Sequence, residues 1–157
     1  MKVRAYIDTQ YNVTAPKISI GCISDKIDYV LLEKQNIIDC NLELKDIDII
    51  EICFLNKDDL DDNVVIIKKL LIDGIDIQHF IYEGEFKPIY DKNWYNSQVK
   101  YHNAMDKLVD GKPSLIQKPG TEMRHNGSWT LSVILPIWKM ILNSWLEEGE
   151  QLYANRK

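Results

Sequence analysis

The sequence predicts an all-β, mainly antiparallel fold: a jelly-roll-like β-sandwich with a long irregular excursion and a C-terminal helix. Short apolar–polar alternating segments recur with turn signals about every 8–12 residues, which is typical of a sandwich. Between residues 63 and 88, an Asp73-Gly74 turn separates two apolar runs. This is a strong hairpin signal, because glycine accepts the positive φ of a type I′ turn.

The strands follow from alternation with a period of two residues. Before the hairpin, the alternating segments are residues 3–8, 17–24, 28–33, 38–45 and 47–55. Residues 64–67 are all β-branched, which predicts a buried strand at the centre of a sheet, and the second arm of the hairpin is expected to run to Glu83-Gly84. Residues 82–90 and 129–135 alternate again, and Pro88 ends the first of them.

Length and charge exclude several classes of protein. A chain of 157 residues fits a single sandwich domain, residues 1–157. The net charge of -5 disfavours nucleic acid as a partner, because phosphate binding needs a concentrated basic face. No apolar run approaches the roughly 20 residues of a membrane span, and the first ten residues lack the apolar core of a signal peptide. We therefore expect a protein made in the cytoplasm, with no membrane partner.

The three cysteines, Cys22, Cys40 and Cys53, each fall within an apolar strand-like segment and have no metal-ligand spacing. An odd number of separated cysteines favours buried thiols, with a single disulfide as the alternative.

The excursion over residues 91–128 contains glycines and prolines and shows little periodicity, apart from a short helix expected at residues 97–108. Loops of this length are usually functional or form assembly contacts. The candidate ligand- or partner-binding residues of this region are Tyr90, Trp94, Tyr95, Tyr101 and Trp129. Their rings could stack on sugars, anchor a protein interface, or simply cover one open end of the sandwich.

The C-terminal helix is expected at residues 136–150, because Pro136 suits a first helical turn. Trp138, Ile141, Leu142 and Trp145 recur at helical spacing and predict a stripe that packs on the sheet. Trp138 and Trp145 are also candidates for docking onto a neighbouring subunit.

An acidic loop precedes the hairpin. Asp58, Asp59, Asp61 and Asp62, together with Asn63, offer the hard oxygen ligands that Ca²⁺ prefers. The spacing is not that of an EF-hand, and a solvated turn explains the same residues. Calcium is the only cofactor that the sequence suggests.

No catalytic motif is present, which predicts a protein that is not an enzyme. His79, His102 and His125 lack metal spacing, and we expect surface histidines. For His125, which is close in sequence to Glu122 and Arg124, a general acid-base role is the alternative. The sequence contains no nucleophile elbow, Walker loop or dinucleotide fingerprint. A carboxylate pair for glycoside hydrolysis depends on the fold and stays open.

Two segments resemble known families. VVIIKKLLIDGIDI, residues 64–77, resembles the β-sandwich of calcium-dependent carbohydrate-binding modules. NGSWTLSVILPIWKMIL, residues 126–142, resembles small β-sandwich tail, fibre or decoration proteins of tailed bacteriophages. The second resemblance implies a virion component that assembles with other chains.

The first hypothesis is accordingly a non-enzymatic β-sandwich for assembly or surface recognition, incorporated into a virus particle, with other protein subunits as partners. The alternative is a carbohydrate-binding module with Trp94, Tyr95 and Trp129 as its platform and a glycan as partner. A hydrolase is the third.

Overall fold

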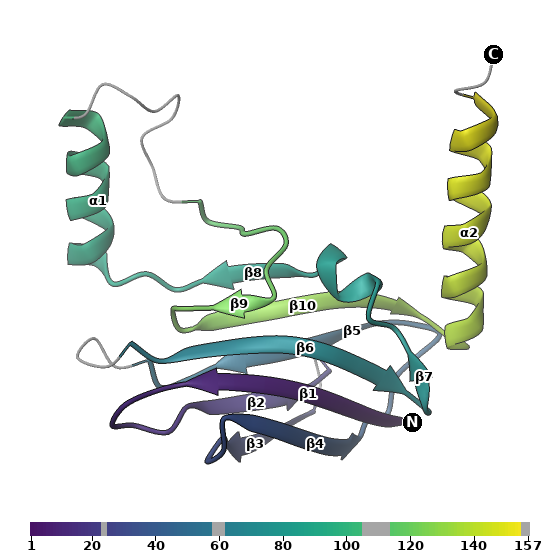
Figure 1. Ribbon diagram of the computed structural model, residues 1–157, viewed down its shortest axis with the longest axis horizontal. Helices are drawn as coiled ribbons and strands as arrows, with labels where there is room; N and C mark the ends of the chain where they lie inside the picture. Colours follow the sequence, from purple (N-terminus) through teal and green to yellow (C-terminus); the bar gives the residue numbers. More distant parts are fainter. Residues whose placement is uncertain (23–24, 58–61, 105–113, 155–157) are drawn as a thin grey trace.

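Two antiparallel sheets face each other and form the predicted β-sandwich (Figure 1). The computed structural model describes residues 1–22, 25–57, 62–104 and 114–154, and for 102–104 and 148–154 the backbone alone. The first sheet contains β1 (Lys2–Gln10), β4 (Gln35–Asn41), β6 (Val64–Ile72), β7 (Ile75–Asp76) and β9 (Glu122–Met123). The second contains β2 (Lys17–Gly21), β3 (Lys26–Val30), β5 (Ile47–Phe54), β8 (Glu85–Pro88) and β10 (Gly127–Ile134). The remaining elements are η1 (Phe80–Glu83), α1 (Lys92–Ala104) and α2 (Ile137–Ala154).

The strand pairing gathers several loops at one end of the sandwich. The first sheet has the order β4–β1–β6–β7 with β9 beside β6, and the second has β3–β2–β5–β10–β8. Gly127, the first residue of β10, lies opposite Phe54 at the end of β5 and Pro88 at the end of β8. Residues 11–16, 55–57, 62–63 and 89–91 therefore lie at the same end of the sandwich, where α1 also stands (Figure 1).

The core lies between the sheets and is built from the inward side chains of alternating strands. Val3, Ala5 and Ile7 of β1 are fully buried, as are Ile50 and Ile52 of β5. The period of two that predicted these strands therefore also identified their buried face.

The Asp73-Gly74 turn is confirmed, with φ of 48° and 84° at its two central residues. The expected second arm of the hairpin is wrong: β7 has only two residues, and the chain then turns into η1. Ile77, Phe80 and Ile81 are buried at spacings of three and four. Side chains three and four residues apart lie on the same side of a helical turn. The turn into η1 therefore places all three side chains in the core, which a continued strand would not do.

The excursion over residues 91–128 is more regular than expected. α1 begins at Lys92 instead of residue 97. β9 adds two residues to the first sheet, where Met123 pairs with Val65 and is fully buried.

The C-terminal helix is confirmed and begins at Ile137, one residue after the predicted start, but most of its apolar stripe does not pack on the sheet. Trp138 and Trp145 are 55% and 68% exposed. Ile137 and Met140, in the first turn, are buried instead. The prediction failed because α2 projects away from the sandwich (Figure 1), so the sheet covers only its base. Neither described helix has the length and apolar character of a membrane-spanning segment.

The cysteines are thiols, as expected, with Cys22 and Cys40 buried and Cys53 half-buried. Burial raises the pKa of the Cys40 thiol to about 11, so it stays protonated at neutral pH.

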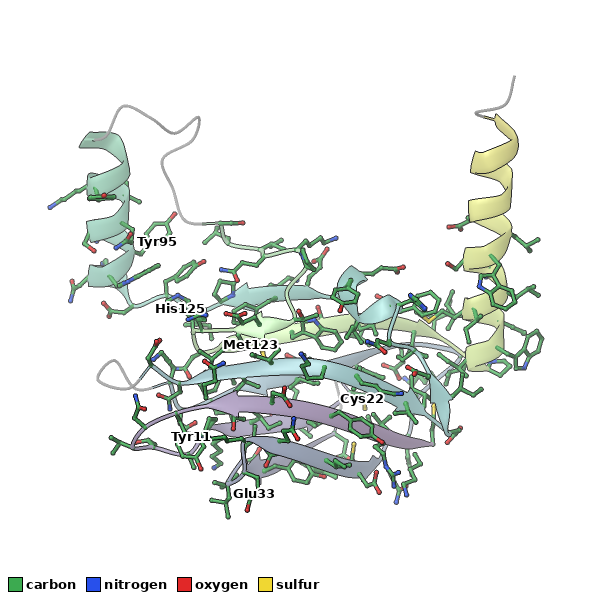
Figure 2. The ribbon with its side chains drawn as sticks, in the orientation of Figure 1. Tyr11, Cys22, Glu33, Tyr95, Met123 and His125 are labelled. Carbon is green, nitrogen blue, oxygen red and sulfur yellow. The ribbon has the colours of Figure 1, made fainter. Side chains whose placement is uncertain are left out.

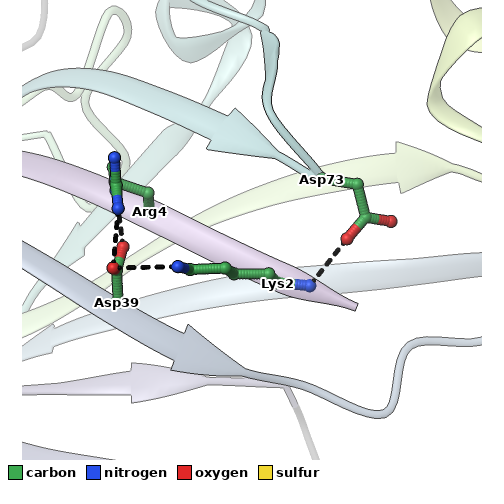
Figure 3. Close-up of polar contacts among 4 residues, drawn as sticks. All are labelled: Lys2, Arg4, Asp39 and Asp73. Atoms are coloured by element: carbon green, nitrogen blue, oxygen red, sulfur yellow. Dashed lines mark hydrogen bonds and ion pairs between the residues drawn. The ribbon is translucent and has the colours of Figure 1, made fainter.

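A charged cluster joins β1 to β4 on the outer face of the first sheet (Figure 3). Arg4 donates from Nε and Nη2 to the two carboxylate oxygens of Asp39 at 2.6 and 2.8 Å. Lys2 Nζ lies 3.1 Å from the same carboxylate. The hydrogen bonds from Arg4 and then Lys2 hold the pKa of Asp39 well below its usual range. The backbone N–H of Lys2 donates to Asp73 Oδ1 at 2.8 Å, which ties the cluster to the hairpin turn.

We expect the contribution of Asp39 to stability to disappear in acid. Because the pKa of Asp39 is lower in the folded than in the unfolded chain, the unfolded chain binds more protons at low pH. The stabilisation is complete above the unfolded pKa of about 3.9 and is lost as the pH falls through the lower folded value. Urea unfolding should show Asp39→Asn less stable than the wild type at pH 7, with a smaller difference below pH 4. Equal stabilities at pH 7 would contradict the assignment.

Candidate functional site

A surface pocket of about 610 Å³ lies where the chain leaves β8 and enters α1. We call it the aromatic pocket. Its lining comes from three segments: residues 89–91 with Trp94, Lys57 after β5, and His125 and Asn126 before β10. These segments meet because β5, β8 and β10 are neighbours in one sheet.

Asp91 fixes the direction in which α1 leaves the sandwich. Its Oδ1 accepts hydrogen bonds from the backbone N–H groups of Asn93 and Trp94, both at 2.9 Å. A carboxylate in this position satisfies donors that have no partner within the helix and complements the positive end of the helix dipole. This cap explains why α1 begins at Lys92 and why Trp94 lies in its first turn.

Three rings cluster around Tyr90. Trp94 stacks on Tyr90 with ring centroids 5.0 Å apart and 22° between the planes. Tyr95 lies 5.8 Å from Tyr90, and His125 meets Tyr90 edge-on at 4.9 Å. His125 is also 4.8 Å from Trp94. Figure 2 shows Tyr95 and His125 on neighbouring elements at the α1 end of the molecule.

Hydrogen bonds hold the ring cluster in place. The Tyr90 hydroxyl donates to the Ser114 carbonyl at 2.7 Å and accepts from Gln117 Nε2 at 3.2 Å. Trp94 is 37% exposed, so part of its ring surface remains accessible at the pocket. The aromatic pocket is therefore a preformed surface that need not be ordered by a ligand.

Asn126 connects the other walls of the pocket. Its side-chain Oδ1 accepts from the Lys57 backbone N–H at 2.7 Å, and its carbonyl accepts from the Ile89 N–H at 2.6 Å. One residue thus holds the segments after β5 and β8 together. Ile89 itself is 71% exposed and adds an apolar edge.

Asparagines also fasten both ends of the acidic loop. Asn56 Nδ2 donates to the Ala15 carbonyl at 3.0 Å, and Asn63 Nδ2 donates to the Thr14 carbonyl at 2.9 Å. Asn63 is fully buried, and its Oδ1 accepts no hydrogen bond among the described residues. The loop ends are therefore held against the turn between β1 and β2.

The predicted calcium ligands fall mainly outside the described residues, which exclude Asp58, Asp59 and Asp61. Asp62 is described and exposed, with Oδ1 4.0 Å from Nη1 of Arg124. Within the described ranges, no three His, Cys, Asp or Glu side chains gather as a metal site. The calcium site stays a prediction about the loop.

The structure brings together only some of the predicted binding residues. Tyr90 and Trp94 line the aromatic pocket, and Tyr95 contacts Tyr90. Tyr101 lies further along α1, 57% exposed, outside the pocket lining. Trp138 and Trp145 are on α2, at the far side of the molecule from α1 (Figure 1).

The prediction that Trp129 belongs to the binding platform is wrong, because its side chain is fully buried and cannot contact a ligand. Its indole packs so closely on Gly84 that a Cβ there would lie 2.4 Å from the ring. Trp129 shares its strand face with Leu131 and Val133, both buried, so alternation along the strand already indicated an inward side chain.

Sequence reasoning missed Lys57, Asp91 and Asn126 as pocket residues and expected His125 to be a surface histidine with no binding role. The Asp91 cap had a local signal, an acidic residue before a helical segment. Asn126 and Lys57 had none, because their contact joins residues 69 positions apart.

The comparisons with known proteins identify the fold. No protein-family model matches the sequence, and no curated protein matches it. The complex of vCBM60 with galactobiose has a TM-score of 0.54 and 11% sequence identity, covering 85% of this chain and 100% of that one. The selenomethionine form of vCBM60 has a TM-score of 0.51 and 10% identity, covering 82% and 89%.

The second structure is described in terms of a circular permutation that links two families of calcium-dependent carbohydrate-binding modules. The chain therefore has a β-sandwich fold like that of a carbohydrate-binding module. Both structures support the resemblance to these modules and neither supports the resemblance to phage accessory proteins.

Removing the helix cap should loosen α1 without unfolding the sandwich. Asp91→Ala is expected to cost about 1 kcal/mol of local stability, because two N–H groups lose their acceptor. Amide hydrogen exchange should then be faster over residues 93–101 and unchanged in β1 and β5. Asp91→Asn, which retains a capping oxygen, should restore most of the protection. Unchanged exchange in Asp91→Ala would mean that the rings, not the cap, position the helix.

Proposed function

We propose that this protein binds carbohydrate at the aromatic pocket. The observation that carries the proposal is a partly exposed Trp94 ring, held rigidly beside polar side chains in a surface pocket of ligand size. The likeness of the fold to a module that binds galactobiose supports the same ligand class.

The pocket offers both kinds of contact that a sugar needs. The apolar C–H face of a pyranose ring can pack on the exposed part of Trp94, with Ile89 at the edge. Asp91 Oδ2 and Asn126 Nδ2 have no hydrogen-bond partner among the described residues, so they can accept from and donate to sugar hydroxyls. The Lys57 and His125 side chains add polar surface on the remaining walls.

This function requires recognition only. A binding pocket with one stacked indole and a few directional polar groups gives selectivity without any chemical step. Sugar binding should be measured with and without calcium. The acidic loop begins directly after Lys57, so its carboxylates are close in sequence to a residue that lines the pocket.

Loss of the Trp94 ring should abolish most sugar binding. Trp94→Ala is expected to weaken galactobiose binding by about tenfold or more, because the stacking surface is removed. Isothermal titration with galactobiose, repeated with calcium and with a chelator, measures the change. Trp145→Ala is the matched control, since this exposed tryptophan lies on α2, outside the pocket. Equal losses in the two variants, or no binding of galactobiose or of a glycan panel under either condition, would contradict the proposal.

A second function, self-association through α2, has its own supporting observation. Trp138, Leu142, Trp145 and Leu146 are 46–68% exposed and lie in two successive turns of the helix. Scattered apolar residues are ordinary on a protein surface, but a continuous apolar face on a projecting helix is typical of an interface.

Charge on that face should prevent the association. Light scattering of the wild type is expected to show an average mass that rises above the monomer with concentration. The double variant Trp138→Glu, Trp145→Glu should stay monomeric, because two carboxylates would be buried unpaired in the contact. Trp94→Ala, outside α2, should behave as the wild type. A monomeric wild type over the whole concentration range would remove the proposal.

A further inference from the structure

A second hollow, of about 730 Å³, lies at the same end of the sandwich but on the first sheet. It is formed by the end of β1, the residues that follow it, and the segment between β3 and β4. In Figure 2, the labelled Tyr11 and Glu33 lie on the lower part of the sandwich, His125 lies on its upper part, and Tyr95 lies on α1 above it. We call it the β1–β4 hollow.

Three hydrogen bonds hold the backbone of this hollow. Thr9 N–H donates to the Lys34 carbonyl at 2.8 Å, and Thr9 Oγ1 donates to the Glu33 carbonyl at 2.7 Å. The Tyr11 hydroxyl donates to the Leu32 carbonyl at 2.7 Å. Because Thr9 is buried, its two hydrogen bonds attach the segment between β3 and β4 to the interior side of β1.

Five polar side chains that line the hollow make no polar contact to the described residues. Within the described part of the chain, the side chains of Asp8, Gln10, Glu33, Lys34 and Gln35 make no hydrogen bond and no ion pair. On the same sheet, by contrast, Arg4 pairs with Asp39 and Lys69 pairs with Asp76, each at 2.6 Å. A rigid backbone that presents unpaired polar groups is the arrangement of a ligand site.

The chemistry of the lining selects the ligand class. The carboxylates of Asp8 and Glu33 disfavour an anion, and Lys34 disfavours a multivalent cation. The amides of Gln10 and Gln35 both donate and accept hydrogen bonds. Tyr11 and Leu32, the latter 68% exposed, add apolar surface. A neutral, hydroxyl-rich molecule with one apolar face matches this combination.

We propose that the β1–β4 hollow is a second carbohydrate site that takes one or two neutral sugar units. This inference rests on the proposed function, because it assigns the same ligand class to a separate set of residues. Two sites at one end of the sandwich make the protein bivalent. A polysaccharide that reaches both sites is then bound more tightly than a disaccharide, through the raised effective concentration at the second site.

Chemical-shift mapping with galactobiose on the whole chain tests the inference. The inference expects shift changes at residues 8–12 and 31–35, saturating independently of changes at residues 89–95 and 125–126. In the double variant Asp8→Ala, Gln35→Ala, the first set should need at least about tenfold more sugar and the second should be unaffected. Neither the Asp8 nor the Gln35 side chain makes a hydrogen bond or an ion pair within the described residues, so we expect the double variant to fold as the wild type does. Glu43→Ala, an exposed carboxylate outside both hollows, is the matched control and should titrate as the wild type.

The outcomes separate the two proposals. Changes confined to residues 89–95 and 125–126, with the double variant unaltered, would overturn the second site and leave the aromatic pocket standing. Changes confined to residues 8–12 and 31–35 would support the second site and refute the pocket. No change in either set would overturn both.

Discussion

The structure depends on burying the inner faces of two sheets against each other. The inward side chains of β1 from Val3 to Thr9, of β5 from Ile50 to Phe54 and of β10 from Trp129 to Val133 are at most 3% exposed. Each fully buried aliphatic or aromatic side chain contributes roughly 1.5–3 kcal/mol, and contacts of this kind outweigh any single polar interaction in the molecule. Burial fixes the strands but places no constraint on the loops at the sandwich ends, which are free to carry polar and aromatic groups.

Short-range polar contacts shape those loops. The Asp91 carboxylate caps α1 and so sets where the helix begins. Hydrogen bonds from and to the side chains of Asn56, Asn63 and Asn126 connect neighbouring segments. Asparagine suits this task, because one side chain both donates and accepts hydrogen bonds. Both hollows at this end consequently have fixed backbones and side chains that remain available. A surface prepared in this way loses little conformational entropy when it binds a ligand.

The surfaces proposed for sugar binding and for self-association lie on different parts of the molecule. The aromatic pocket lies beside the base of α1, and the apolar face of α2 projects from the opposite end of the sandwich (Figure 1). Occupation of one surface therefore leaves the other accessible. Association through α2 would place several pockets on one particle and raise the avidity for a polymeric glycan.

The sequence by itself determined the fold class, most strands, the Asp73-Gly74 turn and the start of α2. These features depend on local periodicity and on the φ angles that Gly and Pro favour. It also grouped Tyr90, Trp94 and Tyr95 as aromatic residues at the start of the excursion, but the helix that brings their rings together begins five residues earlier than expected.

Only the tertiary structure decided which apolar groups are covered. Trp129 is buried and Trp145 is exposed, although both belong to regular apolar patterns. Periodicity identifies an apolar face, but what covers that face depends on where the element stands relative to the rest of the chain. The contacts of Asn126 with Lys57, and of Thr9 with Glu33, join distant segments, so the walls of both hollows exist only after the sheets have paired.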